Sequence, residues 1–330
     1  MRFALVIGVV VGVLVCDSPL HSQAALPSSA SPFKVILLGT AGGPTINPER
    51  LGISTLVVAG PELLLFDAGR GMTFALARLS IRASTVTKVF LTHLHSDHIV
   101  SIPELYLFPW ASQGRKTPLQ IWGPEGTGAM TAKLQEAFAF DIHIRRDVDE
   151  KFAPDGIRIV ATDVAEGTVY EASGVKVTAF LVDHGLVKPA LGYRVDYGGH
   201  SVVLSGDTKP SDNLVKFARG ADVLIHEVGT SKNDPALNGP PNEPMPGRPG
   251  VTREQARTIV NHHTDVAEAT LIFQRVNPKL ALFSHANLPP ADTLATVRRG
   301  YGGRVEFGSD LMTIDIGSEI TIRPFERPPQ

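Results

Sequence analysis

The chain has 330 residues, with 31 lysines and arginines against 33 aspartates and glutamates, and 43% of its residues are hydrophobic. The charges nearly cancel and form no long run of one sign, so the composition gives no electrostatic footprint for nucleic acid or for a polyanionic partner. The hydrophobic fraction is ordinary for a globular protein and is sufficient for a large core. We therefore expect a globular protein without a nucleic-acid partner.

The N-terminal segment resembles an export signal. Arg2 is followed by the 13-residue apolar run FALVIGVVVGVLV at positions 3–15, which is short for a membrane span and typical of a signal peptide. We predict a signal peptide at 1–24, a linker at 25–31 and a periplasmic or secreted protein; an uncleaved membrane anchor is the alternative. The single cysteine, Cys16, lies in this segment, so any metal of the mature chain must be held by histidines and carboxylates.

The remaining chain, 32–326, interleaves strand and helix patterns without a second linker, and we expect a single α/β domain. Runs rich in Val, Ile and Leu, bounded by turn residues, predict strands at 34–39, 53–60, 62–69 and 88–93. Two hairpins are expected, at 168–182 with its turn at Ser173-Gly174 and at 191–206 with its turn at Gly198-Gly199. Helices are expected at 70–80, 126–139, 211–219, 252–260 and 265–276, with Ser211 as an N-cap.

The segment 229–250 interrupts this alternation. It is dense in proline, glycine and asparagine, so no regular element is expected there. A loop of this length is either a lid over a binding site or disordered. We hypothesise that it covers the active-site pocket, with Trp110 and Trp122 as apolar walls; both tryptophans are also compatible with an ordinary core position.

The stretch FLTHLHSDHI, residues 90–99, concentrates metal ligands directly after a predicted strand. In an extended segment His93 and His95 point to the same side, because side chains alternate with a period of two. Asp97 and His98 then begin the following turn or helix. These are too many ligands for one catalytic zinc ion that keeps an open position, so the pattern predicts two adjacent metal ions.

Four later apolar runs also end in residues that can bind metal: His184, Asp207, the pair His226-Glu227, and His285. In open α/β sheets, ligands gather at the carboxyl ends of the strands. A single histidine at such a position is more often a hydrogen-bonded structural residue, but the repetition predicts one converging site.

The motifs GTAGGP, LLFDAG, THLHSDH, DHG…LGYR, SGDT, IHEV, HHT and FSHANLP, in this order along nearly the whole mature chain, resemble the metallo-β-lactamase superfamily. They most resemble the branch that contains ribonuclease Z and related phosphodiesterase- and arylsulfatase-like hydrolases. The resemblance implies an αββα sandwich, in which two mixed β-sheets are flanked by helices within one domain.

The resemblance also implies roles for individual residues. One zinc ion would be held by His93, His95 and His184, and the other by Asp97, His98 and His285, giving two Zn²⁺ per chain. Asp207 would bridge them and Asp67 would orient ligands; Asp97 is also a candidate catalytic residue. Iron or manganese remains compatible with these ligand types. A histidine paired with Glu227 would protonate the leaving group, and the motif register favours His262 over His263. His226 is either a support for the site or a packed core residue.

The resulting prediction is an exported dinuclear zinc hydrolase, in which a metal-bridging hydroxide attacks a small phosphodiester, sulfate ester, carboxylic ester or lactone. Asp207 argues against a β-lactam or amide hydrolase, since β-lactam-hydrolysing members as a rule lack a bridging aspartate. Ribonuclease Z itself fits poorly, because transfer RNA is not expected outside the cytoplasm and only 23 positions separate His184 from Asp207, too few for the family's tRNA-binding arm. An iron-dependent redox enzyme and a non-catalytic metal-binding protein are further alternatives. We expect no nucleic-acid partner, no membrane association after removal of the signal, and leave a homodimer open.

Overall fold

Two mixed β-sheets form the centre of the computed structural model, which describes residues 32–326. The first sheet has the strand order β17-β16-β1-β2-β3-β4-β5-β6; β3 to β6 run parallel, and the other neighbours are antiparallel. Its strands are β1 (Phe33–Gly39), β2 (Ser54–Ala59), β3 (Glu62–Phe66), β4 (Lys88–Phe90), β5 (Leu119–Gly123), β6 (Ile159–Asp163), β16 (Thr313–Ile316) and β17 (Ile320–Arg323).

The second sheet has the order β15-β14-β11-β10-β9-β8-β7, in which β7 to β10 are antiparallel and β10, β11, β14 and β15 are parallel. Its strands are β7 (Gly167–Ala172), β8 (Val175–His184), β9 (Val187–Tyr197), β10 (His200–Leu204), β11 (Val223–Val228), β14 (Leu280–Ala286) and β15 (Val305–Phe307). Both predicted hairpin turns are confirmed. The two central residues of each turn, Ser173 and Gly174 in the first and Gly198 and Gly199 in the second, have positive φ, as a tight turn between two twisted strands requires.

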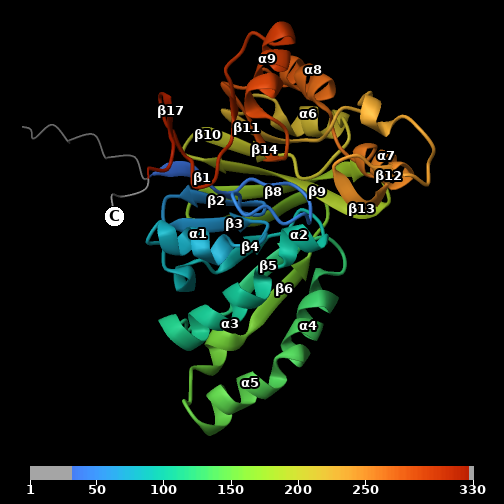
Figure 1. Ribbon diagram of the computed structural model, residues 1–330. Coiled ribbons are helices and arrows are strands. Elements are labelled where there is room, and N and C mark those ends of the chain that lie inside the picture. Colours follow the sequence, from blue (N-terminus) through green and yellow to red (C-terminus); the bar gives the residue numbers. More distant parts are fainter. Residues whose placement is uncertain (1–31, 327–330) are drawn as a thin grey trace, which may run out of the picture. The chain divides into compact units, whose positions relative to one another are not determined.

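Helices cover the outer face of each sheet, so the order of layers is αββα (Figure 1). Apolar residues of α1 and α3 pack on the first sheet, and those of α6, α8 and α9 pack on the second. The helices are α1 (Met72–Arg78), α2 (Ser96–Ile99), α3 (Ile102–Gln113), α4 (Thr127–Ala137), α5 (Ala139–His143), α6 (Asp212–Ala218), α7 (Arg253–Val260), α8 (Val266–Val276) and α9 (Pro290–Gly300), with single turns η1 (Ala83–Thr85), η2 (Ile144–Val148), η3 (Pro154–Ile157) and η4 (Pro235–Leu237). The predicted α/β sandwich is confirmed.

Between the two sheets lies a core of aliphatic side chains and stacked aromatic rings. The ring of Phe90 lies 4.9 Å from that of Trp122 and 5.1 Å from that of Phe66, and the hydroxyl of Tyr193 donates to the carbonyl of Leu91 at 2.7 Å. This packing anchors β4 immediately before the histidine motif. Trp110 is a buried residue of α3, and its indole N–H donates to the carbonyl of Ala153.

The predicted helices all occur, and Ser211 caps α6 by accepting a hydrogen bond from the N–H of Leu214. The prediction for 229–250 is wrong in one respect, because the segment contains η4 and a two-stranded ribbon of β12 (Pro244–Met245) and β13 (Arg248–Thr252). Leu237 and Met245 of this segment pack against Ala256 and Val260 of α7 in a small cluster. This local core explains how so many prolines and glycines adopt a defined conformation.

The predicted signal peptide and linker lie outside the described residues. Within 32–326, no helix combines the length and the apolar character needed to cross a membrane.

Candidate metal centre

The predicted ligands come from neighbouring strand ends of both sheets. Asp67 directly follows β3, the HLHSDH motif follows β4 and runs into α2, and His184 ends β8. Asp207 lies three residues after the end of β10, and His285 is the second-last residue of β14. Both Asp67 and His285 have positive φ, of 56° and 51°, a conformation that costs energy for residues other than glycine and is concentrated at functional sites.

His93, His95 and His184 form the first group of ligands. Nε2 of His93 lies 3.0 Å from Nδ1 of His95, which in turn lies 3.4 Å from Nε2 of His184. The remaining nitrogens of the two buried histidines are engaged, Nδ1 of His93 with the Thr92 hydroxyl and Nδ1 of His184 with the His262 carbonyl. Three imidazole nitrogens therefore face one point, and their orientation is set from behind.

Asp97, His98 and His285 form the second group. Oδ2 of Asp97 lies 3.3 Å from Nε2 of His285 and 3.5 Å from Nε2 of His98. Nδ1 of His98 contacts Oδ2 of Asp67 at 2.8 Å, and Asp67 is itself held by the N–H and hydroxyl of Thr92. Asp67 thus orients His98 as expected, which turns Nε2 of His98 toward the centre.

Nε2 of His98 is buried and has no hydrogen-bond partner within the described residues. A buried polar nitrogen without a partner is costly, and here it faces the carboxylates of Asp97 and Asp207. This unsatisfied nitrogen, with neighbouring imidazole and carboxylate donors, fits a bound divalent metal ion. Zinc suits this donor set, and iron and manganese fit it as well.

Asp207 lies between the two groups. Its Oδ2 is 3.9 Å from Nε2 of both His93 and His184 and 3.5 Å from Nε2 of His98, while its Oδ1 is 3.3 Å from Nδ1 of His285. One carboxylate therefore reaches ligands of both groups, which is the position that a bridging ligand needs.

The electrostatics of the site favour a positive charge at its centre. Burial lowers the pKa of His93 well below its usual value, and burial likewise lowers the pKa of His184, so both are neutral bases. Burial opposes the charge on His98, yet Asp207 and Asp67 outweigh it and raise the pKa of that imidazole well above its usual value. The carboxylates therefore provide negative potential in a buried place, and a metal cation would satisfy it.

Glu227, on β11 (Val223–Val228), is paired with His263 rather than with His262. Nδ1 of His263 lies 3.0 Å from both carboxylate oxygens of Glu227. Glu227 is buried and also accepts hydrogen bonds from the backbone N–H groups of Thr208 and Thr264. The preference for His262 as the partner of Glu227 is therefore wrong, because the turn after α7 directs the ring of His263 inward. Burial opposes the charge of His263, but Glu227 overcomes it and raises the pKa of His263 to about 9.

His262 and His226 occupy other positions. The ring of His262 lines the pocket beside Gly185 and lies 5.8 Å from the ring of His184. The backbone carbonyl of His262 contacts Nδ1 of His184 and so fixes the orientation of the His184 ring. His226 is fully buried, with its ring 6.0 Å from that of Phe273 on α8, and its Nδ1 contacts the carbonyl of Glu227. His226 is thus a packed core residue behind the strand that carries Glu227.

The ligands open into a pocket of about 400 Å³, which we call the central pocket. Part of its wall is formed by the segment 229–250, by β13 (Arg248–Thr252) and by α7, which contribute Gly229, Thr230, Arg248, Val251, Ile259 and Val260. The expectation that this segment covers the site is consistent with this arrangement. The hypothesis that Trp110 and Trp122 form apolar walls of the pocket is wrong, because both rings pack in the core layers described above and neither lines the pocket.

Several supporting residues were not found from the sequence. Thr92 joins Asp67 to His93, and the carboxamide of Asn287 exchanges hydrogen bonds with the backbone of Gly42, which brings the 40–43 loop beside His285. Thr92 directly precedes His93, so its position in the LTH motif was an available signal. Asn287 is two residues beyond His285, but nothing in its immediate surroundings indicated a partner 245 positions away.

Comparisons with known proteins agree with the fold. Residues 63–286 match the family described as Beta-lactamase superfamily domain. The chain is 32% identical over 295 residues to a ribonuclease Z of Mycobacterium marinum, an alignment that covers 86% of this chain and 99% of the relative. Among solved structures, the metallo-β-lactamase fold protein YhfI of Bacillus subtilis aligns with a TM-score of 0.65 at 19% identity, and the short form of human tRNase Z with 0.61 at 23%. Each alignment covers 86% of this chain and 99% of the other.

Proposed function

The chain belongs to the β-lactamase superfamily, among the relatives named ribonuclease Z, and on this premise we propose that it is a two-metal phosphodiesterase. One observation carries the proposal: the carboxylate of Asp207 contacts both ligand groups, and the Glu227–His263 pair lies next to it. A hydrolase of this superfamily needs these two elements, one to hold the metal ions and one to move a proton.

The chain's own residues have distinct tasks in this proposal. His93, His95 and His184 would hold one metal ion, Asp97, His98 and His285 the other, and Asp207 both. When bound, two such ions activate water as a nucleophile and neutralise charge on the attacked phosphate.

His263 holds the proton for the leaving oxygen. Because Nδ1 of His263 faces Glu227, Nε2 is the nitrogen left to donate into the central pocket. Glu227 keeps the imidazole charged and fixes its orientation, as a carboxylate does for a histidine acid. This assigns the proton-donor role to His263 and leaves His262 at the pocket wall.

The bond type follows from the relatives. Ribonuclease Z is by its name an enzyme that acts on RNA, so a phosphodiester is the first substrate class for this chain. The short interval between His184 and Asp207 does not distinguish the chain from that relative. The alignment covers 99% of the relative, so the relative has little room for a long tRNA-binding arm of its own. The name of these relatives conflicts with the expectation of no nucleic-acid partner, so small phosphodiesters and oligonucleotides are both substrates to test.

A sulfate ester, a carboxylic ester and a lactone remain competing substrates for the same two-metal chemistry. Export through the predicted signal peptide at 1–24 is part of the proposal, and the location of the protein in its native cell tests it.

The decisive experiment combines metal analysis with a substrate panel. The purified mature protein is analysed for metal content and assayed with bis-p-nitrophenyl phosphate, p-nitrophenyl sulfate, a phenyl ester, a lactone, a chromogenic β-lactam and a short RNA. We expect about two metal ions per chain, hydrolysis of the phosphodiesters first, loss of activity with a chelator and recovery on adding metal back. Preferred cleavage of the β-lactam, or stoichiometric iron without any hydrolysis, would refute the proposal.

A further inference from the structure

A second hollow adjoins the central pocket. This side groove has a volume of about 1000 Å³ and shares Thr45, Thr230, Arg248, Asn287 and Leu288 with the central pocket. The remaining wall comes from the loop 46–50, from Gly247 and Pro290, from 307–310 and from Pro324 and Phe325. A substrate whose scissile bond lies at the metal ligands can therefore extend past these shared residues into the side groove.

Arg248 is the cationic side chain common to both hollows. It begins β13 and is half-buried. Among residues 32–326 no carboxylate forms an ion pair with its guanidinium, and no hydrogen bond engages it. An arginine that is partly desolvated and has no partner provides a planar, doubly hydrogen-bonding site for a phosphate or carboxylate.

The other arginines of the same region serve the fold. Arg253 pairs with Glu243 and donates to the carbonyl of Ala236, and Arg257 donates to the carbonyls of Leu237 and Gly239. Both therefore hold the segment 229–250 against α7. Arg248 has no such task, although it lies on the ribbon that these contacts position.

The other charged groups of the side groove are engaged or exposed. The guanidinium of Arg50 donates to the carbonyls of Thr40 and Ala286, and Asp310 accepts hydrogen bonds from Thr40 and from the N–H of Leu51. Glu49 is exposed. Arg248 is thus the cation of this groove that remains available to an incoming anion.

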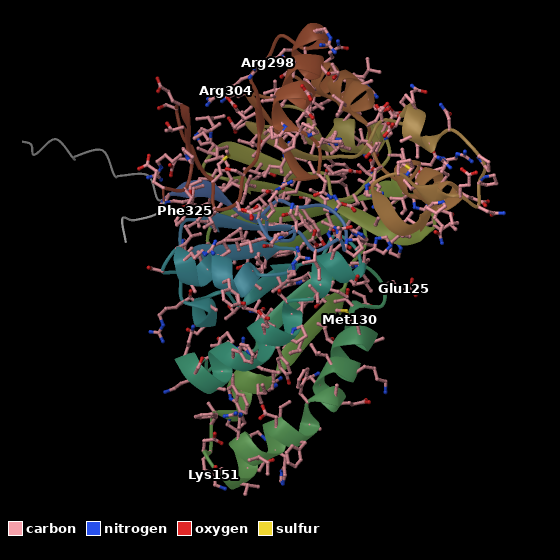
Figure 2. The ribbon with its side chains drawn as sticks, in the orientation of Figure 1. Glu125, Met130, Lys151, Arg298, Arg304 and Phe325 are labelled. Atoms are coloured by element: carbon pink, nitrogen blue, oxygen red, sulfur yellow. The ribbon has the colours of Figure 1, made fainter. Side chains whose placement is uncertain are left out.

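The groove also offers apolar surface. Phe307 and Phe325 are half-buried and line it, and Figure 2 shows Phe325 near the C-terminal end of the described chain. Aromatic rings next to a cation suit a nucleotide, whose base stacks on an aromatic ring while its phosphate binds an arginine.

We propose that Arg248 is a specificity-determining residue that binds a second phosphate of the substrate, one nucleotide away from the phosphodiester that is cleaved. This inference rests on the proposed function and adds the substrate feature that the enzyme selects. The preferred substrate is then a phosphodiester of the nucleotide type that carries a neighbouring phosphate.

The test uses two substrates that differ by one phosphate: the p-nitrophenyl ester of thymidine 5′-phosphate, and the same ester with an additional 3′-phosphate. The metal-loaded wild-type protein should show a kcat/KM about tenfold higher for the second ester, as expected for charge-assisted hydrogen bonds to a phosphate. In Arg248→Ala the ratio of the two kcat/KM values should fall to about one, with the change mainly in KM. Arg248→Lys should give an intermediate ratio, because it keeps the charge and loses the bidentate geometry.

The matched control is Arg219→Ala. Arg219 is exposed and lies outside both hollows, so this variant has the same change in net charge and should keep the wild-type ratio. A wild-type ratio near one, or an unchanged ratio in Arg248→Ala, would overturn the assignment.

Failure of the proposed function gives a different result, namely no hydrolysis of either ester. Arg248 is then tested by calorimetric titration of the metal-loaded protein with thymidine 3′,5′-bisphosphate and with thymidine 5′-phosphate. Tighter binding of the bisphosphate that is lost in Arg248→Ala supports the anion site, and equal binding of the two ligands refutes it.

Discussion

Replacing Glu227 by glutamine removes the charge that keeps His263 protonated while preserving the size of the side chain. Both oxygens of Glu227 lie 3.0 Å from Nδ1 of His263, and the N–H groups of Thr208 and Thr264 hold one of them in place. A glutamine can still accept these backbone hydrogen bonds through its carbonyl oxygen. The variant therefore tests the electrostatic role of Glu227 with little disturbance of the fold.

The size of the effect follows from the pKa of His263. Burial lowers this pKa, but Glu227, with a further contribution from Asp207, outweighs burial and raises it from 6.5 to about 9. A rise of that size corresponds to roughly 3 kcal/mol in favour of the charged form. A histidine with a raised pKa stays protonated at neutral pH and loses its proton as the pH rises through that pKa. In Glu227→Gln the proton is lost at a lower pH, and we expect the alkaline limb of kcat to move down by about one to two pH units. Bound metal ions lower the pKa in both proteins, so the difference between them is the quantity to measure.

The assay compares kcat against pH for p-nitrophenyl and phenyl esters of thymidine 5′-phosphate. Protonation of the leaving oxygen matters more for phenol, which is the poorer leaving group, so Glu227→Gln and His263→Ala should slow the phenyl ester by about 10²–10⁴ and the p-nitrophenyl ester much less. Glu254→Gln, an exposed carboxylate on α7, is the matched control and should behave as wild type. An alkaline limb that stays in place in Glu227→Gln, or equal losses for both leaving groups, would refute the assignment of His263 as the acid.

Three further predictions concern the metal centre, the segment over the pocket and the fold. Asp67→Asn should weaken metal binding by about 10–100-fold, because Asp67 orients His98 from behind; competition with a chromogenic chelator measures this, and an affinity equal to wild type would contradict it. Deleting residues 232–248 should change the relative rates across the substrate panel, because this segment contributes to the pocket wall; unchanged ratios in a folded variant would show that the segment does not select substrate. Ser211→Ala should lower the free energy of unfolding by about 1 kcal/mol through loss of the helix cap on Leu214, measured by urea denaturation, and a change near zero would show that the cap is not stabilising.

Much of the architecture was accessible from local patterns. The apolar runs with period two and the paired turn residues Gly198 and Gly199 are local signals, and they correctly predicted strands and hairpins. Three helices were missed: α3, α5 and α9. α5 has only five residues. The other two were missed for a local reason, since α3 contains Pro109 in its interior and a proline at its start, and α9 begins at Pro290. Proline is tolerated in the first turn of a helix, but from the sequence alone a proline is usually taken as the end of a helix.

The sequence by itself indicated where the candidate ligands lie, because apolar runs that end in metal-binding residues bring those ends to one edge of a sheet. The strand-end pattern also included His226, and the ligand set was selected by the resemblance of the motifs to the family. The sequence could not determine which of two adjacent histidines meets Glu227. His262 and His263 differ by one position, and only the turn after α7 and the packing beside Thr264 direct the second ring inward.

The surroundings of the pocket were also decided only by the tertiary structure. Trp110 and Trp122 lie in core layers because the sheets and helices bury them there, while Arg248 reaches the pocket from a proline- and glycine-rich segment. Side chains that act through contacts between distant segments carry no local periodicity. Their partners are set by how the two sheets, the helices and the ribbon pack together, and local sequence patterns do not encode that arrangement.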